Sequence, residues 1–208
     1  MVISMEPLLF ATHNPWKGRQ FQPVFNAYGF KMLTLQDVPL LAVVKGEDKP
    51  TPVANALEKA RSYHSPAYPW VFADDAGLEI EALNGEPGLQ ARRWGGLFPD
   101  TVDDQTWLDY LLDRMVQVPP SRRGARFVSG WALLAPDGSE FTHSMYWPFE
   151  IATAPLRPMH PGSPISAVRI GPDDDLARRQ LEIAAEWQRW GVFELLKRPG
   201  YDERQVLR

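Results

Sequence analysis

Short apolar runs and stretches of helical periodicity follow one another through the first half of this 208-residue chain. Residues 7–11, 31–35 and 70–72 are apolar runs bounded by polar or turn-forming residues, so each is predicted to form a strand. Apolar residues recur at helical spacing after Trp16 and after Thr51, which predicts a helix at each place. A proline at position 23 lies inside the first helix and predicts a kink or an early end there.

The second half combines two long strands with two amphipathic helices. Residues 125–135 and 140–151 are predicted to form a hairpin across a Pro-Asp-Gly turn. Residues 100–115 and 175–197 carry apolar stripes at helical spacing. The proline-rich segment 152–174 is predicted to be mostly loop. Because no repeat or long linker is found, residues 1–208 are predicted to form a single domain.

Composition narrows the class of protein. Hydrophobic residues make up 44% and charged residues 23%, as in ordinary globular proteins. The absence of cysteine excludes disulfides and thiolate metal sites. No transmembrane helix and no signal peptide are expected, which favours a cytoplasmic protein. A net charge of −4 argues against a nucleic-acid-binding surface, although a few clustered cations would suffice for a small phosphorylated ligand.

Two adjacent carboxylates, Asp74 and Asp75, follow the apolar run at 70–72. They are predicted to stand at the end of a strand and to point in different directions, because side chains alternate along a strand. Gly77 would then let the backbone turn. Mg²⁺ prefers carboxylate oxygens and keeps waters and phosphates as its other ligands, so this stretch is a candidate metal site. A solvated turn is the alternative interpretation of the same residues.

The segment after the first strand is a candidate anion site. A helix that begins just after a strand presents free N–H groups and the positive end of its dipole. Thr12 and Asn14 can donate hydrogen bonds there, and Lys17 brings a cation. The alternative is that Asn14 only caps the helix and that Lys17 is solvated.

Further cations follow in the chain. Asn55 and Lys59 are four residues apart and share one helix face, so Lys59 points either at the acidic pair or at water. Arg92 and Arg93 stand beside an aromatic residue and two glycines, which suits phosphate but is equally typical of a surface loop.

Taken together, these stretches resemble the inosine triphosphate pyrophosphatase family. Residues 12–17 are similar to the family's Thr-Gly-Asn-x-x-Lys, with His13 in place of glycine. Residues 55–60 are similar to the end of Glu-Asn-Ala-x-x-Lys-Ala, with Ala54 in place of the glutamate.

The third block is the longest. Residues 73–96 resemble Ala-Asp-Asp-Ser-Gly-Leu followed by Leu-x-Gly-x-Pro-Gly and Ala-Arg-Tyr-x-Gly, with Ala76 and Trp94 replacing the serine and the tyrosine. A weaker match starts at Ala125. The three main blocks span residues 8–96 and are specific only in combination.

The resemblance implies an α/β fold with an elongated mixed β-sheet flanked by helices, forming two lobes with a nucleotide cleft between them. It also implies a homodimer that hydrolyses a nucleoside triphosphate to the monophosphate and pyrophosphate with Mg²⁺, removing non-standard nucleotides. By motif, the triphosphate would be held by Thr12, Asn14 and Lys17. The implied catalytic residues are Asp75, Asp74 and Lys59. Asp75 would bind metal and position or deprotonate the attacking water, with Asp74 beside it. Lys59 would neutralise phosphate charge.

The second half departs from the family pattern. Residues 162–167 stand where the family has Gly-Phe-Gly-Tyr-Asp-Pro, and Glu182 aligns with a lysine of the final helix. The family's Ser-His-Arg aligns with residues 186–188. These elements read the purine, so base specificity is not predicted, and an anion replaces a cation. Trp187 or Trp190 could stack on a base, although an amphipathic helix favours both as core residues.

Three hypotheses follow. The leading one is a Mg²⁺-dependent nucleoside triphosphate pyrophosphatase of unassigned base specificity. The alternative is a degenerate, non-catalytic nucleotide-binding protein on the same scaffold. The third is a structural α/β domain without a ligand, in which Lys17 and Lys59 face solvent on unrelated sides. The distinguishing feature is whether Asp74, Asp75 and Lys59 converge with Lys17 in one open cleft.

Overall fold

A computed structural model describes residues 5–38, 48–171 and 176–192. Its strands form one mixed sheet of seven in the order β2-β1-β3-β5-β6-β7, with β4 paired to β3. The strands are β1 (Glu6–Phe10), β2 (Phe30–Thr34), β3 (Val71–Ile80), β4 (Pro87–Gly88), β5 (Gly124–Leu134), β6 (Glu140–Ile151) and β7 (Arg169–Ile170). β1 pairs in parallel with β2 and β3, and the other pairings are antiparallel. The predicted α/β class with a mixed sheet is therefore confirmed.

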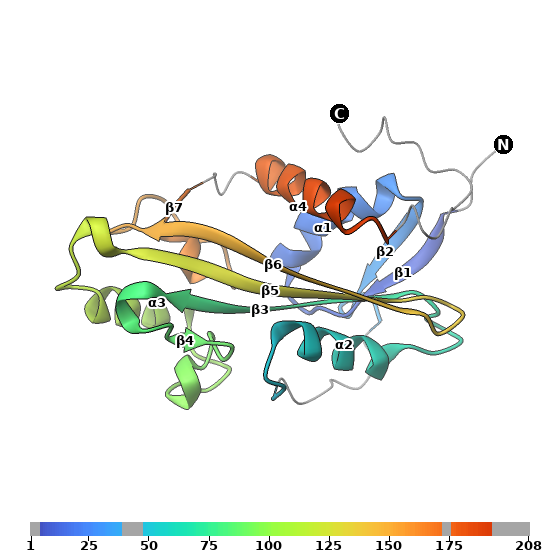
Figure 1. The fold of residues 1–208 in the computed structure, drawn as a ribbon, viewed down its shortest axis with the longest axis horizontal. Helices are drawn as coiled ribbons and strands as arrows, with labels where there is room; N and C mark the ends of the chain where they lie inside the picture. Colours follow the sequence, from blue (N-terminus) through green and yellow to red (C-terminus); the bar gives the residue numbers. More distant parts are fainter. Residues whose placement is uncertain (1–4, 39–47, 172–175, 193–208) are drawn as a thin grey trace.

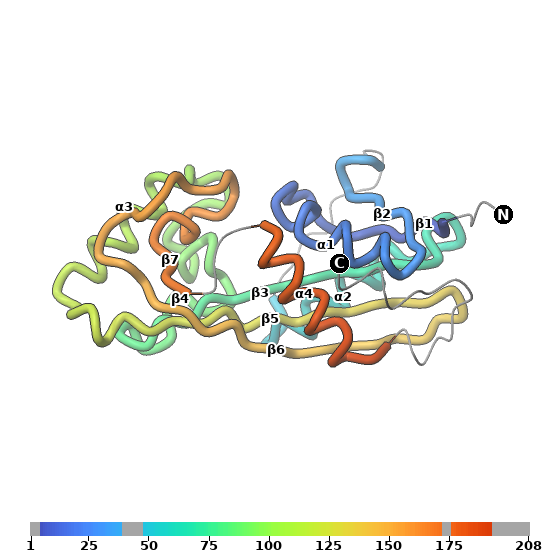
Figure 2. The backbone as a smooth tube through the Cα atoms, turned by 90° about the horizontal axis from the view of Figure 1, so that it is seen from above, coloured from blue at the N-terminus to red at the C-terminus, as the bar shows by residue number. Residues whose placement is uncertain are grey.

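Helices flank the sheet at both ends. They are α1 (Pro15–Ala27), α2 (Pro52–Tyr63), α3 (Asp104–Arg114) and α4 (Leu176–Trp190), with short 3₁₀ turns that include η2 (Trp94–Gly96) and η4 (Pro164–Ala167). Figure 1 shows α1 and α4 above one end of the long strands and α2 below them. Seen from above, this group is separated along the strands from α3 and β7 (Figure 2). We call β1, β2, α1, α2 and α4 the first lobe, and β4, η2, α3, η4 and β7 the second lobe.

The alternation of side chains along β3 decides which helix covers which face. Phe72 packs at 5.1 Å against Phe25 of α1 and at 5.2 Å against Trp187 of α4, measured between ring centroids. Its neighbours Val71 and Ala73 point the other way, into the apolar cluster beneath α2. Burial of these side chains, all at 0–1% exposure, fixes the helices on opposite faces of the sheet.

Pro23 does not end α1, contrary to the predicted early break. The helix continues to Ala27. A proline lacks the N–H that would bond to the carbonyl four residues earlier, which here belongs to Arg19. The Nε2 of Gln180 on α4 donates to that carbonyl oxygen at 2.8 Å. A neighbouring helix therefore satisfies the group that the proline leaves unpaired.

The predicted end of the strand at Asp74 and Asp75 is wrong, because β3 continues to Ile80. It pairs with β5 along its whole length, and this pairing extends it beyond the apolar run. Gly77 lies inside the strand rather than in a turn. A Cβ there would lie 2.9 Å from the carbonyl oxygen of Gly88 on β4, so glycine permits close strand packing.

The remaining predicted strands and helices are confirmed within a few residues. The helix predicted at 100–115 begins later, after Asp103, whose Oδ1 accepts from the N–H of Thr106 at 2.8 Å. The final helix, predicted at 175–197, ends at Trp190 before Gly191, which has a φ of +68°, and residues 193–197 lie outside the described residues. Within the described ranges, no helix is long and apolar enough to cross a membrane.

Candidate functional site

The segment between β1 and α1 is organised by its polar side chains. Asn14 is the N-cap of α1, and its Oδ1 accepts from the N–H groups of Trp16 at 2.9 Å and Lys17 at 3.4 Å. The Oγ1 of Thr12 accepts from the N–H of Asn14 at 3.1 Å. The capping role of Asn14 is thus real, and it fixes the first turn of α1 at the carboxyl end of β1.

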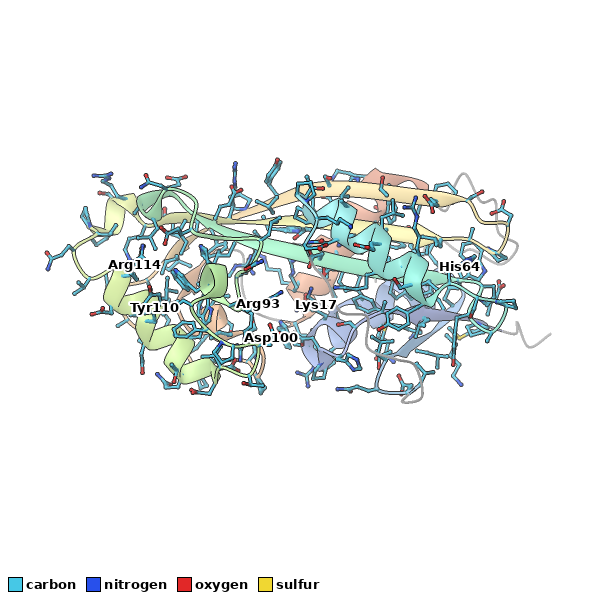
Figure 3. All side chains as sticks on the ribbon, turned by 90° about the horizontal axis from the view of Figure 1, so that it is seen from below. Lys17, His64, Arg93, Asp100, Tyr110 and Arg114 are labelled. Carbon is cyan, nitrogen blue, oxygen red and sulfur yellow. The ribbon has the colours of Figure 1, made fainter. Side chains whose placement is uncertain are left out.

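Lys17 is not merely solvated. Its ammonium nitrogen lies 3.0 Å from Oδ2 of Asp74, and the side chains are 30% and 8% exposed. The apolar face of α1, including Phe21 and Phe25, packs on the sheet and holds Lys17 over β3. Figure 3 shows Lys17 beside the space between the lobes, with Arg93 and Asp100 of the second lobe across from it.

Asp75 points to the opposite face of the sheet, toward α2. The Nδ2 of Asn55 donates to Oδ2 of Asp75 at 2.9 Å, and both side chains are buried. Asn55 also accepts from the N–H of Lys49 through its Oδ1, at 2.9 Å. The amide of Asn55 therefore bridges two groups. Its Nδ2 orients the carboxylate of Asp75, and its Oδ1 holds the backbone at Lys49.

Gly130 of β5 allows α2 to come this close. It stands opposite Asp75 in the β3–β5 pairing. A Cβ at Gly130 would lie 2.2 Å from the backbone nitrogen of Val53, a distance that no side chain could occupy. Because Gly130 has no side chain, α2 packs close to the sheet, and this brings Asn55 within hydrogen-bonding distance of Asp75.

The two carboxylates lie beside a gap in strand pairing. On one edge of β3, β1 pairs with Val71 and Phe72, and β4 pairs with Leu78 and Glu79. Within the described part of the chain, no strand pairs with this edge between those two places. Asp74 and Asp75 therefore lie where this edge of β3 has no strand partner, one on each face, while the other edge is paired with β5.

A cleft of about 300 Å³ lies on the Asp74 face, between the lobes. Among the predicted residues, Asn14, Lys17 and Asp74 line it. Its described lining does not include Thr12, Lys59 or Asp75. Three predicted residues thus lie in the cleft and two, Asp75 and Lys59, lie on the α2 side, where Lys59 is partly buried one turn after Asn55. Thr12 stands outside both groups, beside Asn14.

Sequence reasoning missed Arg169 and Arg179 as cations of the site, whereas it considered Arg92 as suited to phosphate. Beside Lys17, the cleft is lined by the guanidinium groups of Arg92, Arg169 and Arg179, and Asp74 is the acidic residue of its described lining. Arg92 forms an ion pair with Asp104 at 2.5 Å. Arg169 is 8% exposed and lies 5.2 Å from the ring centroid of Phe149. This excess of positive charge suits an anionic ligand.

Arg179 links α4 to the cleft. Its guanidinium carbon lies 4.2 Å from the ring centroid of Trp147, and its Nε lies 3.5 Å from Oε1 of Gln20. Its Nη1 donates to Glu182 at 3.0 Å. The anion expected at Glu182 is therefore paired with an arginine of its own helix. The three-residue spacing is a sequence signal that could have indicated this pair.

The tryptophans of α4 belong to the core. Trp187 is 1% exposed and packs on the aromatic cluster of the first lobe, and Trp190 packs against the same cluster. Neither belongs to the described lining of the cleft. The aromatic rings that do line it include Trp16, Phe127 and Trp147.

Glu186 anchors α4 to β6. Its Oε1 lies 2.6 Å from Nε2 of His143, and Arg189 donates to its other oxygen. Burial opposes ionisation of Glu186, but the hydrogen bonds from Arg189 and His143 outweigh it and hold the pKa of this carboxyl below its ordinary value. The helix that carries Arg179 is thus fixed by a charged network outside the cleft.

Comparison with known proteins adds a family to this geometry. The model of the Ham1 family matches residues 8–160. A dITP/XTP pyrophosphatase of Corynebacterium efficiens is 39% identical over 143 residues, which cover 67% of each chain. One of Mycolicibacterium paratuberculosis is 39% identical over 155 residues, 73% of each chain. A nucleoside-triphosphatase/dITP/XTP pyrophosphatase structure from Mycobacterium abscessus has a TM-score of 0.59 at 30% identity, covering 93% of this chain and 100% of that one. A HAM1 protein from Coxiella burnetii shares the fold, with a TM-score of 0.68 at 22% identity over 91% of this chain and 99% of that one.

Proposed function

The chain belongs to the Ham1 family, and we propose that it hydrolyses a nucleoside triphosphate to the nucleoside monophosphate and pyrophosphate. The observation that carries this proposal is the pairing of Lys17 with Asp74 at the N-terminus of α1, inside a cation-lined cleft. The names of the similar proteins, dITP/XTP pyrophosphatases, support the same reaction class.

The phosphates would bind at the N-terminal end of α1. The positive end of the helix dipole favours an anion there, while Oδ1 of Asn14 accepts from the N–H groups of Trp16 and Lys17. Lys17 would add a charge-assisted hydrogen bond, and Asn14, which lines the cleft, would keep the first turn in place. Thr12 would act through its hydrogen bond with Asn14.

Mg²⁺ is proposed as the cofactor, with Asp75 as its protein ligand. No group of three or more candidate ligand side chains occurs among the described residues. The buried carboxylate of Asp75, which Asn55 orients, fits an ion that takes one protein carboxylate and otherwise water and phosphate oxygens, which is common for Mg²⁺. When bound, such an ion would neutralise charge on the triphosphate and increase the acidity of nearby water.

The residues of the chain would then act mainly by positioning. Water is added across the α–β phosphoanhydride, and its proton would go to a carboxylate oxygen of Asp75, which Asn55 orients. Lys17 and Lys59 would offset the charge of the departing pyrophosphate. Phosphoryl transfer depends on such positioning and charge neutralisation more than on covalent chemistry.

The strand register supports a position for the nucleoside away from this end. Leu78, which lines the cleft, is four residues beyond Asp74, or about 13 Å along the strand. It pairs with Phe127 of β5, which pairs in turn with Trp147 of β6. We propose that the base lies over this aromatic row, near Arg179 and Arg169. A nucleotide of ordinary length spans about that distance between phosphate and base.

A non-catalytic nucleotide-binding protein is the second candidate. It is favoured by one observation, the placement of Asp75 beneath α2 instead of in the lining of the cleft. Such a protein would bind triphosphates through Lys17 without releasing pyrophosphate.

A pyrophosphate-release screen with Mg²⁺ separates the two. Inosine, xanthosine, adenosine, guanosine and pyrimidine triphosphates would be compared under one set of conditions, with the nucleotide product identified by chromatography. The proposal expects equal amounts of monophosphate and pyrophosphate. Binding without turnover would support the second candidate, and release of a diphosphate would contradict the proposed reaction. The homodimer and the cytoplasmic location stay predictions, the first testable by light scattering.

A further inference from the structure

An aromatic stack joins the two lobes across one side of the cleft. The indole of Trp16, the second residue of α1, lies parallel to the imidazole of His160 in the loop after β6. Their ring centroids are 3.9 Å apart and the interplanar angle is 18°. Trp16 lines the cleft from the first lobe, whereas His160 belongs to a loop of the second lobe.

The loop that carries His160 is fastened to the second lobe. The N–H of Gly162 donates to Oδ2 of Asp104, at the start of α3, at 2.7 Å. The N–H of His160 donates to Oγ of Ser166 in η4 at 2.8 Å. Because both anchors belong to the second lobe, residues 160–163 are expected to move with α3 and η4 when the lobes move relative to each other.

The same loop covers the N-cap of α1. Gly162 has a φ of +78°, and a Cβ at this residue would lie 3.5 Å from Nδ2 of Asn14. Asn14 starts the helix end at which the proposed function places the phosphates. The stack and the glycine contact therefore close the cleft on the side of the anion site.

The stack holds this side closed only weakly. A contact between two aromatic rings favours the associated state by roughly tenfold at most. The Nε2 of His160 is buried without a hydrogen-bond partner among the described residues, which disfavours the closed arrangement. The unpaired Nε2 therefore offsets part of what the stack contributes to the closed arrangement.

We propose that Trp16 and His160 form a clasp that parts to admit a nucleoside triphosphate to the N-terminus of α1 and closes over it. This inference rests on the proposed function and adds a conformational step to it. Both are positioning residues, because each acts by holding residues 160–163 of the second lobe against Asn14 of the first.

Substitution separates the stack from a general loss of structure. His160→Ala is expected to raise the KM for inosine triphosphate about 3–10-fold and to leave kcat within twofold, because the open state would release the ligand faster. His160→Phe retains a ring that can stack and is expected to restore the KM. In a protein that already carries Trp16→Ala, adding His160→Ala should raise the KM little further, because the stack is already lost. Equal KM values for the alanine and phenylalanine variants at position 160 would overturn the clasp.

Cross-linking gives the closing test, since the chain has no cysteine of its own. Cysteines replacing both Trp16 and His160 would be joined with a short bifunctional thiol reagent, with each single-cysteine variant as the control. Stopped-flow tryptophan fluorescence would follow association of inosine triphosphate, and pyrophosphate release would be assayed in parallel.

The expected result is an association rate at least tenfold lower after cross-linking, with both single-cysteine variants unaffected by the reagent. Unaltered association and turnover in the cross-linked protein would overturn the clasp and leave the proposed function intact. A wild-type protein that bound inosine triphosphate without turnover would overturn the proposed function alone, because the association rate still tests the clasp. Absence of any nucleoside triphosphate binding would overturn both.

Discussion

The ammonium nitrogen of Lys17 lies 3.0 Å from Oδ2 of Asp74, so the cleft holds an ion pair at the end where phosphates are proposed to bind. The carboxylate is the more deeply buried partner, at 8% exposure against 30% for the lysine. Lys17 is therefore held over β3 with part of its side chain still open to the cleft. A triphosphate would share this cation with Asp74 instead of meeting it unpaired.

Lys17→Ala is predicted to weaken binding of inosine triphosphate by about 10–100-fold and binding of inosine by less than about twofold. The reason is that a charge-assisted hydrogen bond contributes about 1.5–3 kcal/mol and is made only to phosphate. Isothermal titration of both ligands measures the two effects. Lys31→Ala, which removes an exposed lysine of β2, is the matched control. Equal weakening of inosine and its triphosphate would show that Lys17 does not touch phosphate.

Gly130→Ala is predicted to reduce both stability and activity. Its Cβ would meet the backbone of Val53 at 2.2 Å, so α2 must shift and carry Asn55 away from Asp75. Overpacking of this kind costs about 1–3 kcal/mol of unfolding free energy, measurable by urea denaturation.

The control for this change is Gly18→Ala. A Cβ at Gly18 in α1 would be 3.5 Å from the nearest side chain, an ordinary contact. Because alanine is the better helix former, this variant should gain about 0.5–1 kcal/mol. A Gly130→Ala protein as stable and active as wild type would refute the packing argument.

Arg179→Gln is predicted to lower kcat/KM for inosine triphosphate about 3–10-fold, as for loss of one hydrogen bond, and for adenosine triphosphate less. Pairing with Glu182 makes the guanidinium a directional donor with reduced net charge, suited to the 6-oxo and N7 acceptors of a purine. Arg178→Gln, an exposed position of the same helix, serves as the control. A uniform loss for all triphosphates would indicate that Arg179 binds phosphate instead.

Base preference in the wild type is predicted to be weaker than in relatives that carry the family's purine-side motifs. Strong discrimination requires several buried polar groups matched to one base edge. A preference of about a hundredfold or more for inosine and xanthosine forms, or about 2.7 kcal/mol, would show that residues 152–190 contain a replacement for those motifs.

Glu186→Gln is predicted to destabilise the fold at pH 7, by about 1–3 kcal/mol for a hydrogen bond to a charged group. The pKa of Glu186 is lowered in the folded protein, since its bonds to Arg189 and His143 outweigh burial. Its contribution is therefore present above the ordinary glutamate pKa and is lost as the pH falls through the lower folded value. Urea denaturation at pH 7 and below pH 4 should show the difference between variant and wild type shrinking. Glu150→Gln, an exposed change on β6, should show no such trend.

The sequence predicted the features that depend on residues close together in the chain. Asn14 immediately before Pro15 indicated the start of α1, and strand alternation correctly predicted that Asp74 and Asp75 diverge. The continuation of β3 past these acids was missed because it depends on pairing with β5, which is distant in sequence. The survival of α1 beyond Pro23 was missed for the same reason, since the compensating bond comes from Gln180.

The candidate site shows the same limit. The motif residues Asn14 and Lys17 were found from a local block, and the structure places both in the cleft. Arg179 reaches the cleft only because α4 packs beside α1 and over Trp147, an arrangement without a local sequence signal. Glu182 was interpreted, from one alignment position, as an anion that replaces a cation of the family. Because Arg179 pairs with Glu182, the charge of Glu182 alone does not give the net charge of the site.

The most direct test of the account is the initial rate of pyrophosphate release from inosine triphosphate with Mg²⁺, for wild type and Asp75→Asn. Asparagine keeps an oxygen that can accept from Asn55, so the fold should be retained, but it cannot take a proton from water. The account predicts a rate about 10²–10⁴-fold lower with an unchanged melting temperature, while Asp137→Asn in the exposed hairpin turn matches wild type. Near wild-type release by Asp75→Asn would contradict the assignment of Asp75 as the catalytic carboxylate.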